Sequence, residues 1–405
     1  MSGTVIVGAG QAGYQTAESL RQEGYEAPIT LIGAEPHAPY QRPPLSKAYL
    51  LGETDRIRLK FRTEDYYQKH GIDLRTGVEV LSIDRDARRL TLSDGPPQVY
   101  DQLVLAVGAS VRRLPVPGED SDGVFYLKTL DDVDRIEAAL AAANTAVVIG
   151  AGFIGLEFAA VARKLGKEVT VLEAMPRVMA RVVSPELSAF FTGLHTENGV
   201  SLVCDAQVSE IKNSDNKVTG VACTDGRTFA ADLVVVGIGI VPETALAEAA
   251  GLTCENGIRV DSQCRTNDPR IFAVGDCASF HHPFADGLIR LESVQNAADQ
   301  GRVVAAVIAG KEKTYDVVPW FWSDQYAVKL QMVGLQAGCD QVVTRGDVAG
   351  GKFSLFHYRQ GVLRAVDSVS KPADHIQGRK LLAAGISPTP EQAADADFKL
   401  KDLLG

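Results

Sequence analysis

Two glycine-rich segments carry the residues whose chemistry is easiest to recognise. They span residues 8–13 and 150–155, and each has the spacing Gly-x-Gly-x-x-Gly. Glycines at this spacing allow a tight turn and a close approach of the backbone to a pyrophosphate at the start of a helix. About 20 residues after each segment stands an acid, Glu35 or Glu173, whose carboxylate can accept hydrogen bonds from a ribose. These residues therefore indicate the binding of two dinucleotides.

The residues around each segment predict the strand–turn–helix–strand unit that such a site needs. The predicted elements are a strand over 4–7, a helix over 15–23 and a strand over 29–32, and then a strand over 146–149, a helix ending at Leu165 and a strand over 168–172. Because both copies have this complete context, two dinucleotide sites are favoured over two glycine turns without a ligand.

Further apolar runs predict an α/β fold. The runs 103–107, 233–236 and 271–274 are typical of strands buried on both faces of a parallel sheet, and Asp276 follows the last one. From Pro319 onward the pattern changes to short alternating strands, predicted over 327–333, 341–344, 352–358 and 362–368, with helical segments after them. The predicted fold is α/β, with two Rossmann-like dinucleotide-binding domains and a C-terminal α+β domain.

The composition limits the class of protein. The chain has 405 residues, enough for about two or three domains. Its net charge of −10 argues against a general binder of nucleic acid, which needs a basic surface. Without a membrane-length apolar run or a secretory signal pattern, we expect a cytoplasmic protein. The six cysteines begin at Cys204 and contain no Cys-x-x-Cys pair, so they indicate neither a disulfide framework nor a metal site.

Five shorter motifs, together with the two units, carry a family resemblance. They are Arg42-Pro43-Pro44-Leu45-Ser46-Lys47, Gly237-Ile238-Gly239-Ile240-Val241-Pro242, Ala273-Val274-Gly275-Asp276-Cys277-Ala278, Arg290-Leu291-Glu292-Ser293-Val294 and Trp320-Phe321-Trp322-Ser323-Asp324-Gln325. Over nearly its whole length, the chain resembles the FAD-dependent, NADH-using ferredoxin reductases that serve bacterial haem monooxygenases and aromatic dioxygenases.

The resemblance implies a glutathione-reductase-like arrangement of domains. A discontinuous FAD-binding domain would cover about 1–110 and 241–317, an NADH-binding domain 111–240, and the C-terminal domain 318–405. Electrons would pass from NADH by way of FAD to a two-iron, two-sulfur ferredoxin. We expect a monomer, with no nucleic acid or membrane among its partners.

The cofactor-binding residues are carried over from the family motifs position by position. They are Gly8, Gly10, Ala12, Gly13, Glu35, Arg42, Pro44, Lys47, Val80, Lys128, Gly150, Gly152, Ile154, Gly155, Glu157, Glu173, Gly237, Gly239, Asp276, Glu292, Val294 and Trp322. Asp276 would hold the ribityl chain of FAD, because a carboxylate accepts hydrogen bonds from hydroxyl groups. Ala34 stands where relatives carry an acid, so the adenosine ribose is assigned to Glu35, with a solvated loop acid as the alternative. Lys128 stands where relatives often carry Arg, and its role stays open.

Lys47, Glu157 and Trp322 are the residues that the resemblance places at the reaction centre. Paired prolines fix a rigid wall before Lys47, and the family lays the flavin ring against it. Glu157 lies in an apolar helix segment and needs a partner, which the resemblance identifies as Lys47. Trp322 would form part of the wall between the flavin and a docked ferredoxin. The alternatives are a surface turn for Lys47, an acid in the first helical turn favoured by the macrodipole for Glu157, and core packing for Trp322.

Charged residues set expectations for the coenzyme and the partner. Glu173 favours NADH over NADPH because its carboxylate repels a 2′-phosphate, although Arg177 could soften that preference. Two-iron ferredoxins are usually acidic, so a basic patch must offset the chain's own negative charge where they dock. We assign this patch to Arg62, Arg302 and Lys329, and the alternative is that these are scattered solvated charges.

Three other functions compete with this interpretation. A thiol-dependent NADH oxidase, peroxidase or disulfide reductase needs a cysteine near the FAD, and residues 1–203 contain none. A rubredoxin reductase would differ only in its docking surface, which no motif records. A redox-dependent signalling protein resembling apoptosis-inducing factor shares the loop with Lys47, and slow turnover with ferredoxin would distinguish it.

Overall fold

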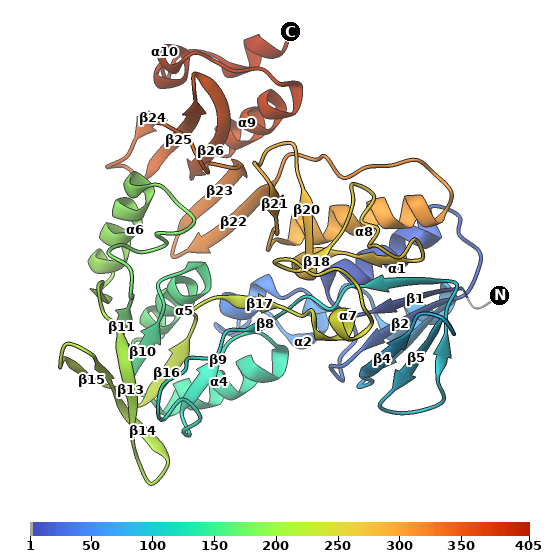
Figure 1. Ribbon diagram of the computed structural model, residues 1–405. Helices are drawn as coiled ribbons and strands as arrows, with labels where there is room; N and C mark the ends of the chain where they lie inside the picture. Colours follow the sequence, from blue (N-terminus) through green and yellow to red (C-terminus); the bar gives the residue numbers. More distant parts are fainter. Residues whose placement is uncertain (1–2) are drawn as a thin grey trace.

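The computed structural model describes residues 3–405, which form two Rossmann-type units and a C-terminal domain (Figure 1). The first unit is built on a parallel sheet with the strand order β19-β7-β1-β2-β3. Its strands are β1 (Thr4–Val7), β2 (Ile29–Gly33), β3 (Ile72–Thr76), β7 (Gln102–Leu105) and β19 (Ile271–Ala273). β1, β2 and β19 are buried along their whole length and β7 from Leu103 to Leu105, as the continuous apolar runs predict.

Two helices of the first unit cross closely beside this sheet. They are α1 (Gln11–Gln22) and α8 (Val294–Ile308). A Cβ at Gly301 of α8 would lie 3.0 Å from the Thr16 hydroxyl of α1, so the absence of a side chain allows the close contact. The predicted start of the first helix, residue 15, was wrong. The helix starts at Gln11 because the backbone turns at Gly10, and Gly13 belongs to the helix instead of the turn.

The second unit repeats this plan with the parallel strand order β12-β11-β10-β16-β9. Its strands are β9 (Val124–Tyr126), β10 (Thr145–Ile149), β11 (Glu168–Leu172), β12 (Ser201–Val203) and β16 (Leu233–Val236). Its helices are α4 (Leu130–Ala142), α5 (Phe153–Lys164) and α6 (Pro185–Glu197). The strands predicted in this unit match the observed ones to within a residue.

A pair of short antiparallel strands connects the two units. β8 (Ala109–Val111) lies beside β17 (Ile240–Pro242), so the chain leaves the first unit and returns to it at adjacent positions. Ser110 is opposite Val241, so the domain boundaries predicted at these positions fall within this pair. The remaining small elements are η1 (Pro43–Ser46), α2 (Arg56–Leu59), α3 (Glu64–Lys69), β4 (Val80–Asp84), β5 (Arg89–Leu92), β6 (Gln98–Val99), β13 (Val208–Ser214), β14 (Lys217–Cys223), β15 (Thr228–Ala230), α7 (Ala245–Ala249), β18 (Ile258–Arg259), η2 (Gly275–Cys277), β20 (Ala278–His281) and β21 (Leu288–Ile289).

The C-terminal domain is an antiparallel sheet with helices. Its strand order is β22-β23-β26-β25-β24. The elements are β22 (Trp320–Gln325), β23 (Val328–Gly334), β24 (Gln341–Asp347), β25 (Lys352–Arg359), β26 (Val362–Val369), α9 (Pro372–Ala384), α10 (Pro390–Ala394) and η3 (Leu400–Leu404). The sequence did not predict β22, because its aromatic start has no alternation of polar and apolar residues.

β22 lies where the three parts of the molecule meet. The ring of Phe321 lies 4.7 Å from that of Phe153 at the start of α5, and the Trp320 backbone N–H donates to Gln295 of α8 at 3.1 Å. β22 therefore contacts both units (Figure 1), and residues of other strands add further contacts, such as Phe353 of β25 with Phe190 of α6. Within residues 3–405, no helix combines the length and the apolar composition that a bilayer crossing needs.

Candidate active site

The first glycine turn, residues 8–13, leads from β1 into α1. Gly8 has φ +107°, which glycine adopts without strain, and a Cβ there would lie 2.1 Å from the Ala106 carbonyl oxygen. A Cβ at Gly13 would lie 1.8 Å from the Gly8 carbonyl oxygen. At Gly10, by contrast, a Cβ would meet no atom of the described chain within 4 Å. An open backbone at a helix N-terminus fits a pyrophosphate.

The second glycine turn, residues 150–155, has the same construction. Gly150 has φ +103°, and a Cβ at Gly155 would lie 2.1 Å from the Gly150 carbonyl oxygen. Gly152 again faces open space among the described residues. Ile154, in the first turn of α5, is 46% exposed although it is apolar. An exposed apolar side chain beside an open phosphate site fits contact with a second nucleotide.

Glu173 lies at the second glycine turn, where the sequence predicts the ribose acid. Its Oε2 accepts a hydrogen bond from the Ala151 backbone at 2.7 Å, and its Oε1 accepts one from Met175 at 2.9 Å. The Arg177 guanidinium donates to the carbonyl oxygens of Val183 and Ala180, both at 2.9 Å. Arg177 is therefore bound to its own loop, and no cation among these contacts offsets the Glu173 carboxylate.

Arg42 contacts both Glu35 and Lys128. Glu35 forms an ion pair with Arg42 and accepts a hydrogen bond from the Tyr40 hydroxyl at 2.6 Å. Arg42 also donates to the Lys128 carbonyl oxygen at 2.9 Å, and the Lys128 ammonium donates to the Ala109 carbonyl oxygen. Burial lowers the pKa of Lys128, and the positive charge of Arg42 lowers it further. The assignment of Glu35 to a ribose stays a prediction.

Asp276 follows β19 in the η2 turn, at the carboxyl edge of the first sheet. Burial raises the pKa of its carboxyl to about 6, and the negative charge of Glu292 contributes. Arg290 donates to Glu292 Oε1 at 2.6 Å, while its buried Nε has no partner among the described residues. A poorly solvated carboxyl gains from hydroxyl donors, so this corner fits the hydroxyl-rich chain of FAD.

Two of the other predicted cofactor residues, Gly275's neighbour Ala12 and Gly237, lie in or beside these two turns. A Cβ at Gly275 would lie 3.1 Å from the Ala12 side chain, and a Cβ at Gly237 would lie 3.6 Å from Gly155. Pro44 lies in η1, Val80 at the start of β4, Gly239 before β17 and Val294 at the start of α8.

Lys47 and Glu157 form a buried ion pair between the two units. Lys47 Nζ lies 2.6 Å from Glu157 Oε2, which also accepts a hydrogen bond from the Ser46 hydroxyl at 2.6 Å. The other carboxylate oxygen, Oε1, accepts one from the Ser323 hydroxyl of β22 at 2.6 Å. Glu157 is only 4% exposed. The pair that the resemblance implies is present, and the roles of Ser46 and Ser323 were not foreseen.

The placement of Glu157 in the first helical turn was wrong. Because α5 begins at Phe153, Glu157 lies in the second turn, beyond the unpaired N–H groups of the helix start. Its partners are side chains from two other parts of the molecule. The macrodipole alternative therefore does not explain this carboxylate.

Trp322 lies next to Ser323 on β22 and is half-buried. Its ring centroid is 5.5 Å from that of Trp320, and the Arg379 guanidinium lies 5.0 Å from the Trp320 ring. The side chain is not enclosed in the core. Its position beside the Glu157 contact is compatible with the predicted wall.

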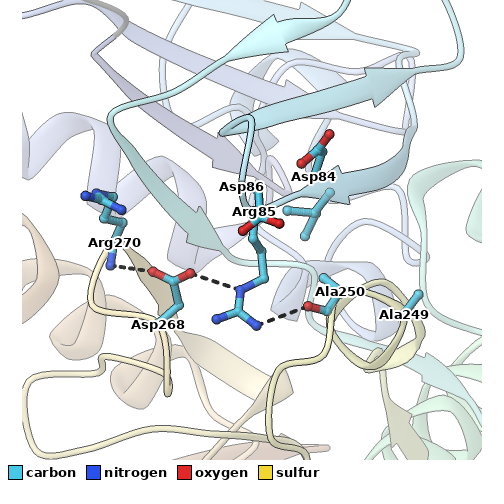
Figure 2. Close-up of a pocket in the computed structure, with 8 residues that line it drawn as sticks. Asp84, Arg85, Asp86, Ala249, Ala250, Asp268 and Arg270 are labelled. Carbon is cyan, nitrogen blue, oxygen red and sulfur yellow. Dashed lines mark hydrogen bonds and ion pairs between the residues drawn. The ribbon is translucent and has the colours of Figure 1, made fainter.

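A polar pocket lies elsewhere, between the hairpin that joins β4 to β5 and the end of α7 (Figure 2). Asp268 accepts hydrogen bonds from Arg85 Nε at 2.9 Å and from the Arg270 backbone at 3.0 Å, and Arg85 donates to the Ala250 carbonyl oxygen at 3.3 Å. Because these groups form hydrogen bonds with one another, we interpret the pocket as a structural contact between the β4–β5 hairpin and the segments around α7 and Asp268.

Two open glycine turns, with a Lys–Glu pair between the units that carry them, fit an oxidoreductase that binds two dinucleotides. The sequence model described as pyridine nucleotide-disulphide oxidoreductase matches residues 3–301, and the model described as reductase C-terminal matches residues 320–404. The chain belongs to the pyridine nucleotide-disulphide oxidoreductase family.

Individual relatives agree with this assignment. The chain is 51% identical to rhodocoxin reductase of Rhodococcus erythropolis, over 98% of this chain and 93% of that protein. It is 43% identical to putidaredoxin reductase of Pseudomonas putida, over 99% and 96%. The crystal structure of the ferredoxin reductase for the CYP199A2 system from Rhodopseudomonas palustris is 50% identical, covers 100% of both chains and has a TM-score of 0.98.

These likenesses confirm the predicted fold class and the predicted cofactors, FAD and NAD(H). The chain is a flavoprotein oxidoreductase. The roles of the individual site residues stay predictions.

The two open glycines give the first testable prediction. Gly152→Ala adds a methyl group where the second dinucleotide would lie, without meeting protein atoms. We expect it to weaken NADH binding at least about tenfold while the melting temperature and the FAD content stay unchanged. Gly10→Ala is the matched variant, and it should lose FAD and keep NADH binding in the fraction that retains FAD. Unchanged NADH affinity in Gly152→Ala would contradict this placement.

The buried ion pair gives the second prediction. Lys47→Ala leaves the Glu157 carboxylate without its cation, which costs ~3–5 kcal/mol in fully buried cases. We expect slower flavin reduction by NADH and a shifted flavin potential, measured by stopped-flow absorbance and redox titration. Lys164→Ala is the control. Lys164 lies on α5, the helix that carries Glu157, and its Nζ forms an exposed ion pair with Glu53 Oε1 at 2.7 Å. Wild-type rate and potential in Lys47→Ala would show that the pair is not at the flavin.

Proposed function

We propose that this chain is the NADH-dependent ferredoxin reductase of an oxygenase system, with a two-iron, two-sulfur ferredoxin as the acceptor and a haem monooxygenase or aromatic dioxygenase downstream. The observation that carries the proposal is the Lys47–Glu157 pair, which joins the unit with the first glycine turn to the unit with the second. Relatives over nearly the whole chain are reductases of this kind. One of the related structures is a covalent complex of putidaredoxin reductase with putidaredoxin.

The protein's own contribution is to position the two nucleotides and the Glu157 side chain. FAD, when bound, supplies the chemistry that accepts an electron pair and releases single electrons. Lys47, Ser46 and Ser323 donate three hydrogen bonds to the Glu157 carboxylate, which hold the almost fully buried side chain in one orientation. Gly10 and Gly152 leave room for the two pyrophosphates. Hydride transfer needs this alignment and no acid–base triad.

Cysteine chemistry is not part of the proposal. Cys277, next to Asp276, is buried, and burial raises the pKa of its thiol to about 11. Burial also raises the pKa of Cys264. Because the thiolate is the reactive form, both residues are inert at neutral pH.

A single experiment separates this function from its alternatives. Anaerobic reduction by NADH, followed by titration with ferredoxins from the same genome and with rubredoxin, should give fast reoxidation by a ferredoxin. Fast reoxidation by rubredoxin alone would identify a rubredoxin reductase. Slow turnover with every acceptor would favour a signalling protein.

The third prediction concerns the coenzyme. Glu173 lies beside the second glycine turn, and Arg177 is bound to its own loop, so kcat/KM should be at least about tenfold higher with NADH than with NADPH. Glu173→Ala should raise KM for NADH with a smaller change in kcat, because the ribose contact is present in the ground state and the transition state alike. Glu168→Ala, at the other end of β11, is the control. Equal kcat/KM values for the two coenzymes would refute the role of Glu173.

The proposed docking patch contains paired charges. Arg62 Nη2 lies 2.8 Å from Glu18 Oε1, and Arg302 Nη1 lies 2.5 Å from Asp299 Oδ1. Lys329 is exposed on β23, opposite Asp324 of β22. The three cations thus stand next to acids, which weakens any long-range field, so we propose that they act at short range on an acidic ferredoxin.

The fourth prediction tests this patch. Arg302→Glu should slow ferredoxin reduction about tenfold at low ionic strength, with a smaller effect in high salt, and should leave ferricyanide reduction unchanged. Arg135→Glu is a closely matched control, since Arg135 pairs with Asp132 three residues earlier on α4, also at 2.5 Å. Unchanged ferredoxin kinetics in Arg302→Glu would remove this residue from the docking site.

A further inference from the structure

Strand β22 has two faces with different functions. Its odd-numbered residues contact the second unit: Phe321 packs against Phe153, Ser323 donates to Glu157, and Gln325 hydrogen-bonds to His195 of α6. Alternation along the strand places the even-numbered Trp322 on the opposite face. The strand that carries the predicted flavin wall is therefore fixed by its other face to the helix that carries Glu157.

The polar contacts of this face form a continuous chain. Ser323 Oγ lies 2.6 Å from Glu157 Oε1 and 3.2 Å from Gln325 Nε2. Gln325 Oε1 lies 2.8 Å from His195 Nε2, and His195 Nδ1 lies 3.3 Å from the Tyr326 hydroxyl. Ser323, Gln325 and His195 are almost completely buried. Water therefore does not compete for these groups.

The chemistry of the groups fixes the direction of every bond in the chain. The Glu157 carboxylate is only an acceptor, so the Ser323 hydroxyl must donate to it and accept from the Gln325 amide N–H. The Gln325 carbonyl oxygen then accepts from His195 Nε2–H, and Tyr326 donates to His195 Nδ1. This requires a neutral imidazole, and burial lowers the pKa of His195 accordingly. Every donor points towards Glu157.

We propose that Ser323 is a positioning residue for the reaction of the proposed function, on which this inference rests. Backed by Gln325 and His195, its hydroxyl holds one oxygen of Glu157, while Lys47 and Ser46 hold the other. The carboxylate is thereby fixed relative to both nucleotide sites and to the strand of Trp322.

Two variants and one control test this role in stopped-flow reduction of the holoenzyme by NADH. Ser323→Ala removes the donor. Gln325→Glu has the same size but offers the Ser323 hydroxyl a competing carboxylate. Both should lower the limiting rate of flavin reduction about tenfold, with the apparent Kd for NADH changed less than about twofold. Ser354→Ala should leave both values unchanged, because Ser354 is also buried and donates to a carboxylate, Asp374 at 3.0 Å, but in another part of the same sheet.

A spectroscopic measurement tests the direction of the chain independently of activity. The histidine side-chain ¹⁵N spectrum, assigned with a His195→Gln sample, should show His195 protonated at Nε2 and bare at Nδ1 at neutral pH. In Gln325→Glu both ring nitrogens should be protonated. The opposite tautomer in the wild type would overturn the proposal, because Gln325 would then turn its carbonyl oxygen to Ser323 and draw the hydroxyl away from Glu157.

The kinetic outcomes are equally decisive. A wild-type limiting rate in Ser323→Ala, a loss of equal size in Ser354→Ala, or a change confined to Kd would each overturn the positioning role. If NADH does not reduce the wild-type flavoprotein, the proposed function itself fails, and the spectrum alone decides the direction of the chain.

Discussion

The buried carboxylate of Glu157 is the constraint on which the rest of the structure depends. A charge this far from water is tolerated only with full compensation, and its hydrogen-bond donors come from two other parts of the molecule: Lys47 and Ser46 from the first unit and Ser323 from the C-terminal domain. Glu157 itself belongs to the second unit. The hydrogen bonds to this one carboxylate therefore join all three domains.

The two glycine turns have the same construction, which leaves backbone open to a pyrophosphate at the start of a helix. In each, a glycine with positive φ and a glycine packed on its carbonyl oxygen shape the turn, and a glycine between them leaves the backbone open. Both turns follow the carboxyl ends of central strands, β1 and β10, which is where α/β sheets bind their ligands. The repeated geometry accounts for a chain that binds two dinucleotides, and the Lys47–Glu157 pair joins the two units that bind them.

Local patterns predicted the parts of the fold whose causes are local. The glycine spacing and the continuous apolar runs identified both Rossmann units, and an apolar helix segment containing Glu157 required a partner. The extent of α1 was missed because Gly13 belongs to the helix. β22 was missed because its first residues, all aromatic, do not alternate with polar ones; the strand is held by contacts with α5 and α8. Ser323 and His195 lie 166 and 130 residues from their partners Glu157 and Gln325, so no local pattern could join them.

Glu157 is proposed to stand where the two nucleotides meet, and a crystal structure of the holoenzyme with NAD⁺ would show whether it does. We expect the nicotinamide carboxamide to lie within hydrogen-bonding distance of the Glu157 carboxylate, with Lys47 and Ser323 still bound to it and the pyrophosphate at Gly152. A nicotinamide ring bound away from Glu157, with the Lys47–Glu157 pair undisturbed, would contradict it.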